Sequence, residues 1–90
     1  MDIDSVLLAL HALDNRSRMG IFRLLARRAP EVIPVEEIAE ELGILRNAAT
    51  QHLGVLARAG LVVGRRQAGT AVYRADTVAF RGLINFLDAI

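Results

Sequence analysis

The chain has 90 residues, the size of one small domain, and 53% of them are apolar, a share that leaves apolar surface for a partner. It contains no cysteine, which excludes disulfides, thiolate metal sites and cysteine nucleophiles within these residues. No apolar run approaches the roughly 18–20 residues of a membrane span. The start, Met1–Asp4, is acidic, unlike the basic head of a signal peptide. We therefore expect a cytoplasmic protein with no membrane partner.

Charge is unevenly distributed along the chain, although the net charge is only +1. All 11 basic residues are arginines. Residues 46–75 hold five of them and no Asp or Glu, whereas residues 1–45 hold eight of the ten acids. A long stretch without carboxylates is a candidate surface for a polyanion. The alternative is a solvated face that arose by chance, and the order of structural elements has to decide.

Helical spacing of apolar residues predicts four helices in the first two thirds of the chain. The first covers residues 3–13. The second follows Asn15, a good amino-terminal cap, and ends before Pro30. The third covers 35–42 and the fourth 46–59. Glycines end both of these helices, and the segment bracketed by Pro30 and Pro34 is predicted to be a loop or a short extended stretch.

After the fourth helix the apolar period changes from 3.6 to 2. Residues 61–75 contain two β-rich stretches around a turn at Gly69, which predicts a hairpin. A last helix over 78–88 follows, capped by Asp76 or Thr77. The fold class is therefore mainly α with a small β-hairpin, in the order α-α-α-α-β-β-α, and we expect residues 1–90 to form one domain.

A short connection with a glycine joins the third and fourth helices, as in a helix-turn-helix whose second helix enters the major groove of DNA. A hairpin directly after this unit is a wing. The helix-turn-helix then covers 35–59 and the wing 61–75. The stretch without carboxylates coincides with the second helix and the wing. Charge and element order thus agree on double-stranded DNA as the partner.

Four segments of the sequence carry a specific resemblance: 12–18, 36–44, 50–62 and 65–73. Together they resemble the ArsR/SmtB family of winged helix-turn-helix repressors over nearly the whole chain. The best motif is the run Thr50-x-His52-Leu53 followed by Ala59-Gly-Leu-Val. The resemblance implies a homodimer that binds operator DNA and represses transcription until an inducer, often a metal or metalloid ion, releases it.

Candidate DNA contacts lie on the fourth helix and the wing. Arginine matches the edge of guanine, and asparagine or glutamine matches adenine. His52 stands at the family's histidine position, and Arg18 matches its arginine before the second helix, where a structural ion pair is an equal alternative to phosphate contact. A merely solvated surface is the alternative for the whole set. The candidates are Arg46, Asn47, Thr50, Gln51, His52, Arg65, Arg66, Gln67, Thr70 and Arg18.

The first and last helices, 3–13 and 78–88, carry more apolar residues than one small core can hold. A two-fold interface would cover them and would place two recognition helices about one DNA turn apart, roughly 34 Å. The alternative is an entirely intramolecular core. The candidate interface residues are Leu7, Leu10, Phe80, Leu83, Ile84, Phe86 and Leu87.

No catalytic or metal site is predicted. The glutamates of the third helix (36, 37, 40 and 41) have no nucleophile or ligand set beside them and are interpreted as a solvated face, so we expect neither an enzyme nor a cofactor. The family's cysteine site on the third helix and its Asp/His site on the last helix are both absent.

Two hypotheses about the inducer stay open. A cysteine tail that binds arsenite or another metalloid is missing beyond Ile90, or the inducer is different or absent. A winged-helix module that binds protein instead of DNA is the alternative function. Leu45 stands where a capping residue is expected, so the start of the fourth helix is predicted to fray, by about 1 kcal/mol of lost capping, unless Asn47 caps instead.

Overall fold

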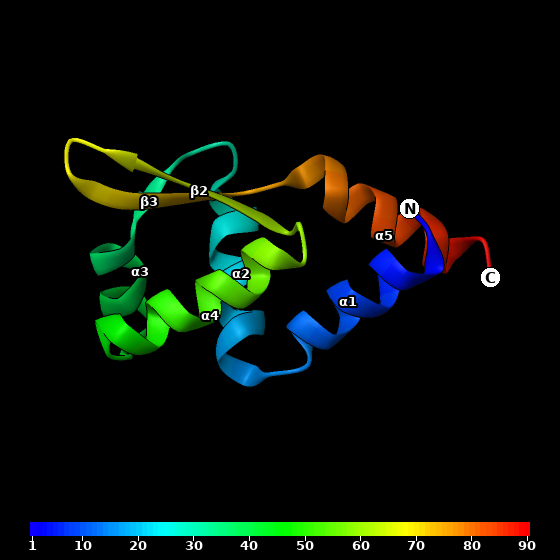
Figure 1. Cartoon of the computed structure of the whole chain (residues 1–90), viewed down its shortest axis with the longest axis horizontal. Helices are drawn as coiled ribbons and strands as arrows, with labels where there is room; N and C mark the ends of the chain where they lie inside the picture. The colour runs from blue at the N-terminus through cyan, green and yellow to red at the C-terminus, as the bar shows by residue number, and fades with distance from the viewer.

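The computed structural model describes residues 1–90 as five helices and a three-stranded antiparallel sheet (Figure 1). The helices are α1 (Ile3–Leu13), α2 (Arg16–Arg28), α3 (Val35–Leu42), α4 (Arg46–Arg58) and α5 (Thr77–Asp88). The strands are β1 (Ile33–Pro34), β2 (Val62–Gln67) and β3 (Thr70–Ala75), in the sheet order β1-β3-β2. The predicted winged helix-turn-helix order is confirmed, with one strand more than the hairpin alone.

Side-chain caps set the starts of three helices. The carboxylate of Asp2 accepts a hydrogen bond from the Ser5 amide at 2.8 Å, and the side-chain oxygen of Asn15 accepts one from the Arg18 amide at 3.0 Å. Asp76 caps α5 in the same way. Each cap satisfies an amide that the first turn of a helix leaves without a partner. The predicted starts of α2 and α5 therefore have a local cause in the sequence.

The turn of the helix-turn-helix depends on Gly43. Its φ of +64° lies in the left-handed region, and its amide donates to the carbonyls of Ala39 and Glu40 at the end of α3. Only Ile44 and Leu45 then remain before α4 begins. The short connection predicted from the sequence is confirmed.

The hairpin closes with a two-residue loop. Gln67 pairs with Thr70 across the strands, and the loop residues Ala68 and Gly69 both have positive φ, +52° and +80°. This is the geometry of the tight turns that match the twist of a hairpin. Strand β1 adds only two residues, Ile33 and Pro34, which pair with Tyr73 and Val72 of β3.

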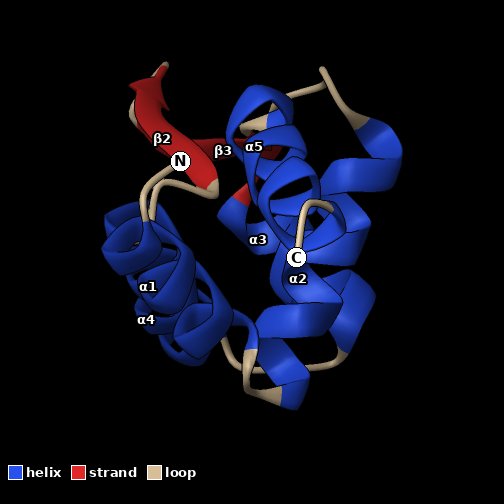
Figure 2. Ribbon diagram, turned by 90° about the vertical axis from the view of Figure 1, so that its right-hand side faces the viewer, coloured by secondary structure: helices blue, strands red, loops and turns tan.

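The core lies where α1, α2, α3, α4 and the sheet meet, and the molecule is elongated, 40 × 22 × 20 Å. Seen along the long axis, α1 and α4 lie on one side and α2 and α5 on the other (Figure 2). Phe22 of α2 packs on Phe80 of α5 with ring centroids 4.9 Å apart. None of the helices is long and apolar enough to span a bilayer.

The apolar spacing of α2 also suggests Met19 as a core residue, and the structure corrects this. Met19 is exposed, whereas Ile21 is fully buried beside Phe22 and Leu25. Residues 21, 22 and 25 share one side of a helix with 3.6 residues per turn, and Met19 lies outside that side.

Candidate nucleic-acid interface

The orientation of α4 is fixed by its buried side. Ala49, Leu53 and Leu56 are fully buried. The opposite surface is left to solvent, and the exposed candidates on it are Arg46, Asn47, Thr50 and Gln51. His52 is half-buried at the border between the two sides. Polar side chains suited to base edges therefore stand together at the amino-terminal half of α4, the part that reads bases in helix-turn-helix proteins.

Residues 46–75 contain no carboxylate, but a carboxylate of α3 lies beside Arg46 in the folded chain. Glu36, in the first turn of α3, lies with its Oε1 3.5 Å from Nε of Arg46. Both side chains remain more than half exposed, 58% for Arg46 and 54% for Glu36. An exposed ion pair of this kind is weak, about 0–1 kcal/mol. Arg46 is therefore paired only weakly at the start of α4.

Arg58 belongs to the same surface and was missed by sequence reasoning. Asn47, Gln51, Gly54 and Arg58 recur at helical spacing, so they share one face of α4. The Arg58 guanidinium lies over Gly54, since a β-carbon at Gly54 would be 3.4 Å from its Nη1. The helical spacing alone places Arg58 on this face. It was not among the candidates because base contacts in helix-turn-helix proteins come from the start of the helix.

The wing presents its polar side chains around the hairpin turn. Nη2 of Arg65 donates to Oε1 of Gln67 at 3.0 Å, and Nη2 of Arg66 donates to the carbonyl of Gly69 at 2.6 Å. These three side chains are exposed, and Thr70 is half-buried at the foot of the turn. The wing arginines are thus held near the tip without an acidic partner.

Arg18 does not join this surface. Its Nε donates to the carbonyl of Ala12 at 2.6 Å, and the side chain is half-buried. The bond ties the start of α2 to the end of α1. Arg18 therefore makes a structural contact, to a backbone carbonyl and not to the acidic partner of the alternative ion pair, and its phosphate contact stays a prediction.

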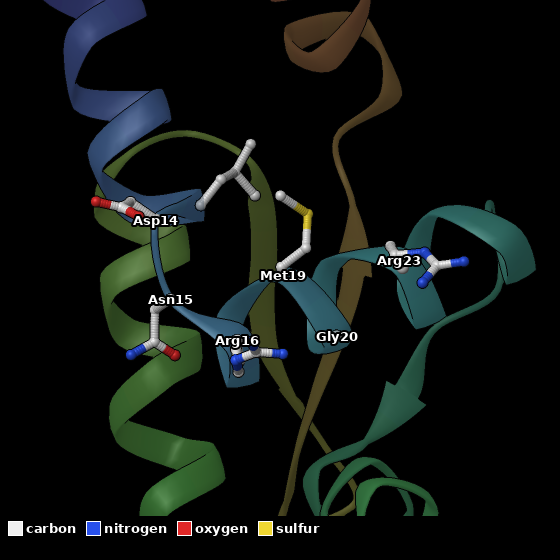
Figure 3. Close-up of a pocket in the computed structure, with 7 residues that line it drawn as sticks. Asp14, Asn15, Arg16, Met19, Gly20 and Arg23 are labelled. Atoms are coloured by element: carbon white, nitrogen blue, oxygen red, sulfur yellow. The ribbon is translucent and has the colours of Figure 1, made fainter.

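Arg16 is one of the arginines of α2 that remain free. It is exposed, forms no ion pair, and lines an open hollow at the α1–α2 turn together with Asn15, Met19 and Arg23 (Figure 3). A second hollow joins Arg16 to Ile44, in the turn that leads into α4. Arg16 is therefore a better candidate than Arg18 for a contact beside the helix-turn-helix.

Arg28, at the end of α2, forms ion pairs with three glutamates. Its guanidinium contacts carboxylates of Glu31 and Glu37 at 2.6 Å each and of Glu41 at 3.8 Å. The hydrogen bonds from Arg28 lower the pKa of the Glu31 carboxyl below its ordinary value. This cluster joins α2 to α3 and gives a cationic partner to two of the four glutamates of the predicted solvated face, Glu37 and Glu41.

The predicted interface residues of α1 and α5 fall into three groups. Leu7, Leu10, Ile84 and Leu87 are exposed. Phe80 and Phe86 are half-buried. The prediction for Leu83 is wrong, because it is only 2% exposed and packs in the core of its own chain. With Ile3, which is also exposed, five of the remaining residues form a stripe on each helix: Ile3, Leu7 and Leu10 on α1, and Phe80, Ile84 and Leu87 on α5, with Phe86 outside the stripe.

Residues 13–65 match the family model of a helix-turn-helix domain. A solution structure from Mycobacterium bovis, described as the homodimeric winged helix-turn-helix DNA-binding domain of a possible ArsR-family transcriptional regulator, is 31% identical. The match covers 97% of this chain and 80% of that one, with a TM-score of 0.76. The chain belongs to the ArsR-like winged helix-turn-helix regulators.

Two further structures agree with this assignment. An ArsR-like transcriptional regulator from Rhodococcus sp. RHA1 has the same fold, with a TM-score of 0.83 over 96% of this chain and 78% of that one at 23% identity. NolR from Sinorhizobium fredii is 28% identical, with a TM-score of 0.72 over 96% of this chain and 80% of that one. No curated protein gives a significant match. Family and fold make this ArsR-like protein a DNA-binding transcription regulator and not an enzyme.

Proposed function

We propose that this ArsR-like regulator is a homodimeric repressor that binds an imperfect inverted repeat and blocks transcription by occupying the operator. The observation that supports this most directly is the composition of the exposed side of α4, where Arg46, Asn47, Thr50 and Gln51 stand together while the apolar side is buried. These are the side chains that hydrogen-bond base edges in the major groove. The wing arginines 65 and 66 are proposed to hold neighbouring phosphates or the minor groove.

The dimer is supported by what α1 and α5 expose. Each helix has an apolar stripe that its own chain covers only in part, and large exposed apolar surfaces mark interaction sites. The similar domain from Mycobacterium bovis is described as homodimeric. A two-fold axis through these helices pairs two copies of α4 with the two halves of an inverted repeat, roughly 34 Å apart.

The salt dependence of binding tests the proposal. Residues 46–75 hold five arginines per chain, hence ten per dimer. If half to all of them contact phosphate, the log–log slope of affinity against salt is about −4 to −9. The measurement is a titration of a duplex selected from a random pool, at several salt concentrations. A flat response, or no selected duplex, contradicts the proposal and favours a module that binds protein.

The inducer has two alternatives that predict different results. If a cysteine tail beyond Ile90 binds arsenite, then arsenite releases the full-length protein from DNA and does not release residues 1–90. If the inducer belongs to another class or is absent, arsenite has no effect on either. As a regulator of operator DNA, the protein is proposed to act in the cytoplasm.

A further inference from the structure

Leu45 has an unusual position for a leucine. It immediately precedes α4, next to Arg46, and its side chain is 79% exposed, more than any other leucine of the chain. It does not belong to the apolar stripes of α1 and α5, which lie at the other end of the molecule (Figure 1). The predicted dimer interface therefore does not explain the exposure of Leu45.

Leu45 also leaves the start of α4 without a side-chain cap. Leu45 is the amino-terminal cap residue of α4, and no side chain accepts a hydrogen bond from the first turn. Asn47 does not replace it, so the predicted lack of a cap is confirmed. Ser, Thr, Asp or Asn at this position would satisfy one of the free amides. An exposed leucine is thus unfavourable here for capping, and its side chain is free to make a contact outside the chain.

The chemistry of the neighbouring surface indicates that contact. Side chains at the start of α4 face the major groove in the proposed complex, where almost every base-edge group is a hydrogen-bond donor or acceptor. The apolar exception is the C5-methyl group of thymine. A leucine can make only apolar contacts. We propose that Leu45 contacts a thymine methyl in each half-site and so helps to determine which sequence is bound. The inference rests on the proposed DNA binding.

A uracil scan tests the contact because deoxyuridine lacks only this methyl group. A duplex is selected from a random pool with the wild-type chain, and each thymine is replaced in turn. At one thymine position in each half-site, replacement by uracil is expected to lower the affinity of the wild-type chain about three- to fivefold. This is the effect of removing one buried methyl-sized group. Leu45→Ala binds the thymine and uracil duplexes equally. Val78→Ala, which truncates an exposed apolar residue of α5, retains the wild-type difference.

A second variant separates this role from a structural one. Leu45→Ser supplies the missing cap and is expected to raise the melting temperature by about 4–8 °C, while it abolishes the thymine preference. A wild-type chain that is insensitive to every uracil, or a Leu45→Ala variant that keeps the uracil penalty, overturns the inference alone. If no duplex is selected, the proposed function fails first and the inference with it.

Discussion

The two ends of this elongated molecule expose different chemistry. Around α4 and the wing, the exposed side chains include many arginines and amides, and one acid, Glu36, pairs with Arg46. Along α1 and α5 the exposed side chains are largely aliphatic. Only 18 of the 90 residues are buried, so the large apolar share of the sequence is not explained by the core. The comparison indicates that one end is built for a polyanion and the other for a second copy of the chain.

The largest effect is expected from a charge in the apolar stripe. Leu7→Glu is expected to give folded monomers and to weaken operator binding about 10²- to 10⁴-fold, because two linked half-site contacts become one. Sedimentation measures the assembly and a DNA titration the affinity. Val78→Glu places the same charge on an exposed residue of α5 outside the stripe and is expected to stay dimeric. A Leu7→Glu variant that stays dimeric would contradict the assignment of the α1 and α5 end to the dimer interface.

At the opposite end, Arg46→Ala is expected to weaken operator binding by about 1–3 kcal/mol and to relax base preference at one position. The reason is the loss of a guanidinium that matches the edge of guanine. Binding to a panel of single-base operator variants measures both effects. Arg23→Ala removes an exposed, unpaired arginine of α2 and serves as the control. Equal losses in the two variants would show only a general effect of charge.

A gain of affinity is expected from Glu36→Gln. The substitution removes the carboxylate beside Nε of Arg46, so the arginine reaches DNA without first breaking an ion pair. Exposed pairs are worth about 0.2–1 kcal/mol, so the gain is at most about fivefold. Glu40→Gln makes the same charge change on α3 without an ion pair and is expected to give a smaller gain. If both variants gain equally, long-range charge explains the result.

The smallest effect concerns the acidic cluster, away from both ends. Because Arg28 lowers the pKa of Glu31 in the folded chain, the stabilisation is present above the ordinary glutamate pKa and is lost as the pH falls through the lower folded value. Melting temperatures between neutral and acidic pH should therefore fall less for Glu31→Gln than for the wild type. Glu40→Gln should keep the wild-type profile. Identical profiles for Glu31→Gln and the wild type would exclude this contribution.

Much of the fold could be predicted because its signals are local. Asn15, Gly43 and Asp76 act on amides a few residues away, and Gly69 determines a turn within the hairpin. Strand β1 could be predicted only as a loop or extended stretch, because two residues show no period and their pairing with β3 is distant in the sequence.

The errors at the candidate sites have a related cause. Arg16 and Arg18 look alike in the sequence, and only the position of the Ala12 carbonyl shows which one is held inside. Likewise, both Leu83 and Ile84 are apolar residues of α5, and the rotation of the helix decides which one is buried. The distance between Glu36 and Arg46 depends on how α3 crosses α4, which no local pattern records.

The short strand β1 also sets the mechanics of the wing. It supports β3 only at Val72 and Tyr73, and Gly64 leaves room for the Tyr73 ring, since a β-carbon there would lie 2.6 Å from its Cε1. Beyond this point the ribbon is two-stranded, and only the pairs Arg66–Ala71 and Gln67–Thr70 lie between the three-stranded part and the turn. In the proposed complex, this short two-stranded end is the part of the wing that meets a groove whose width varies with base sequence.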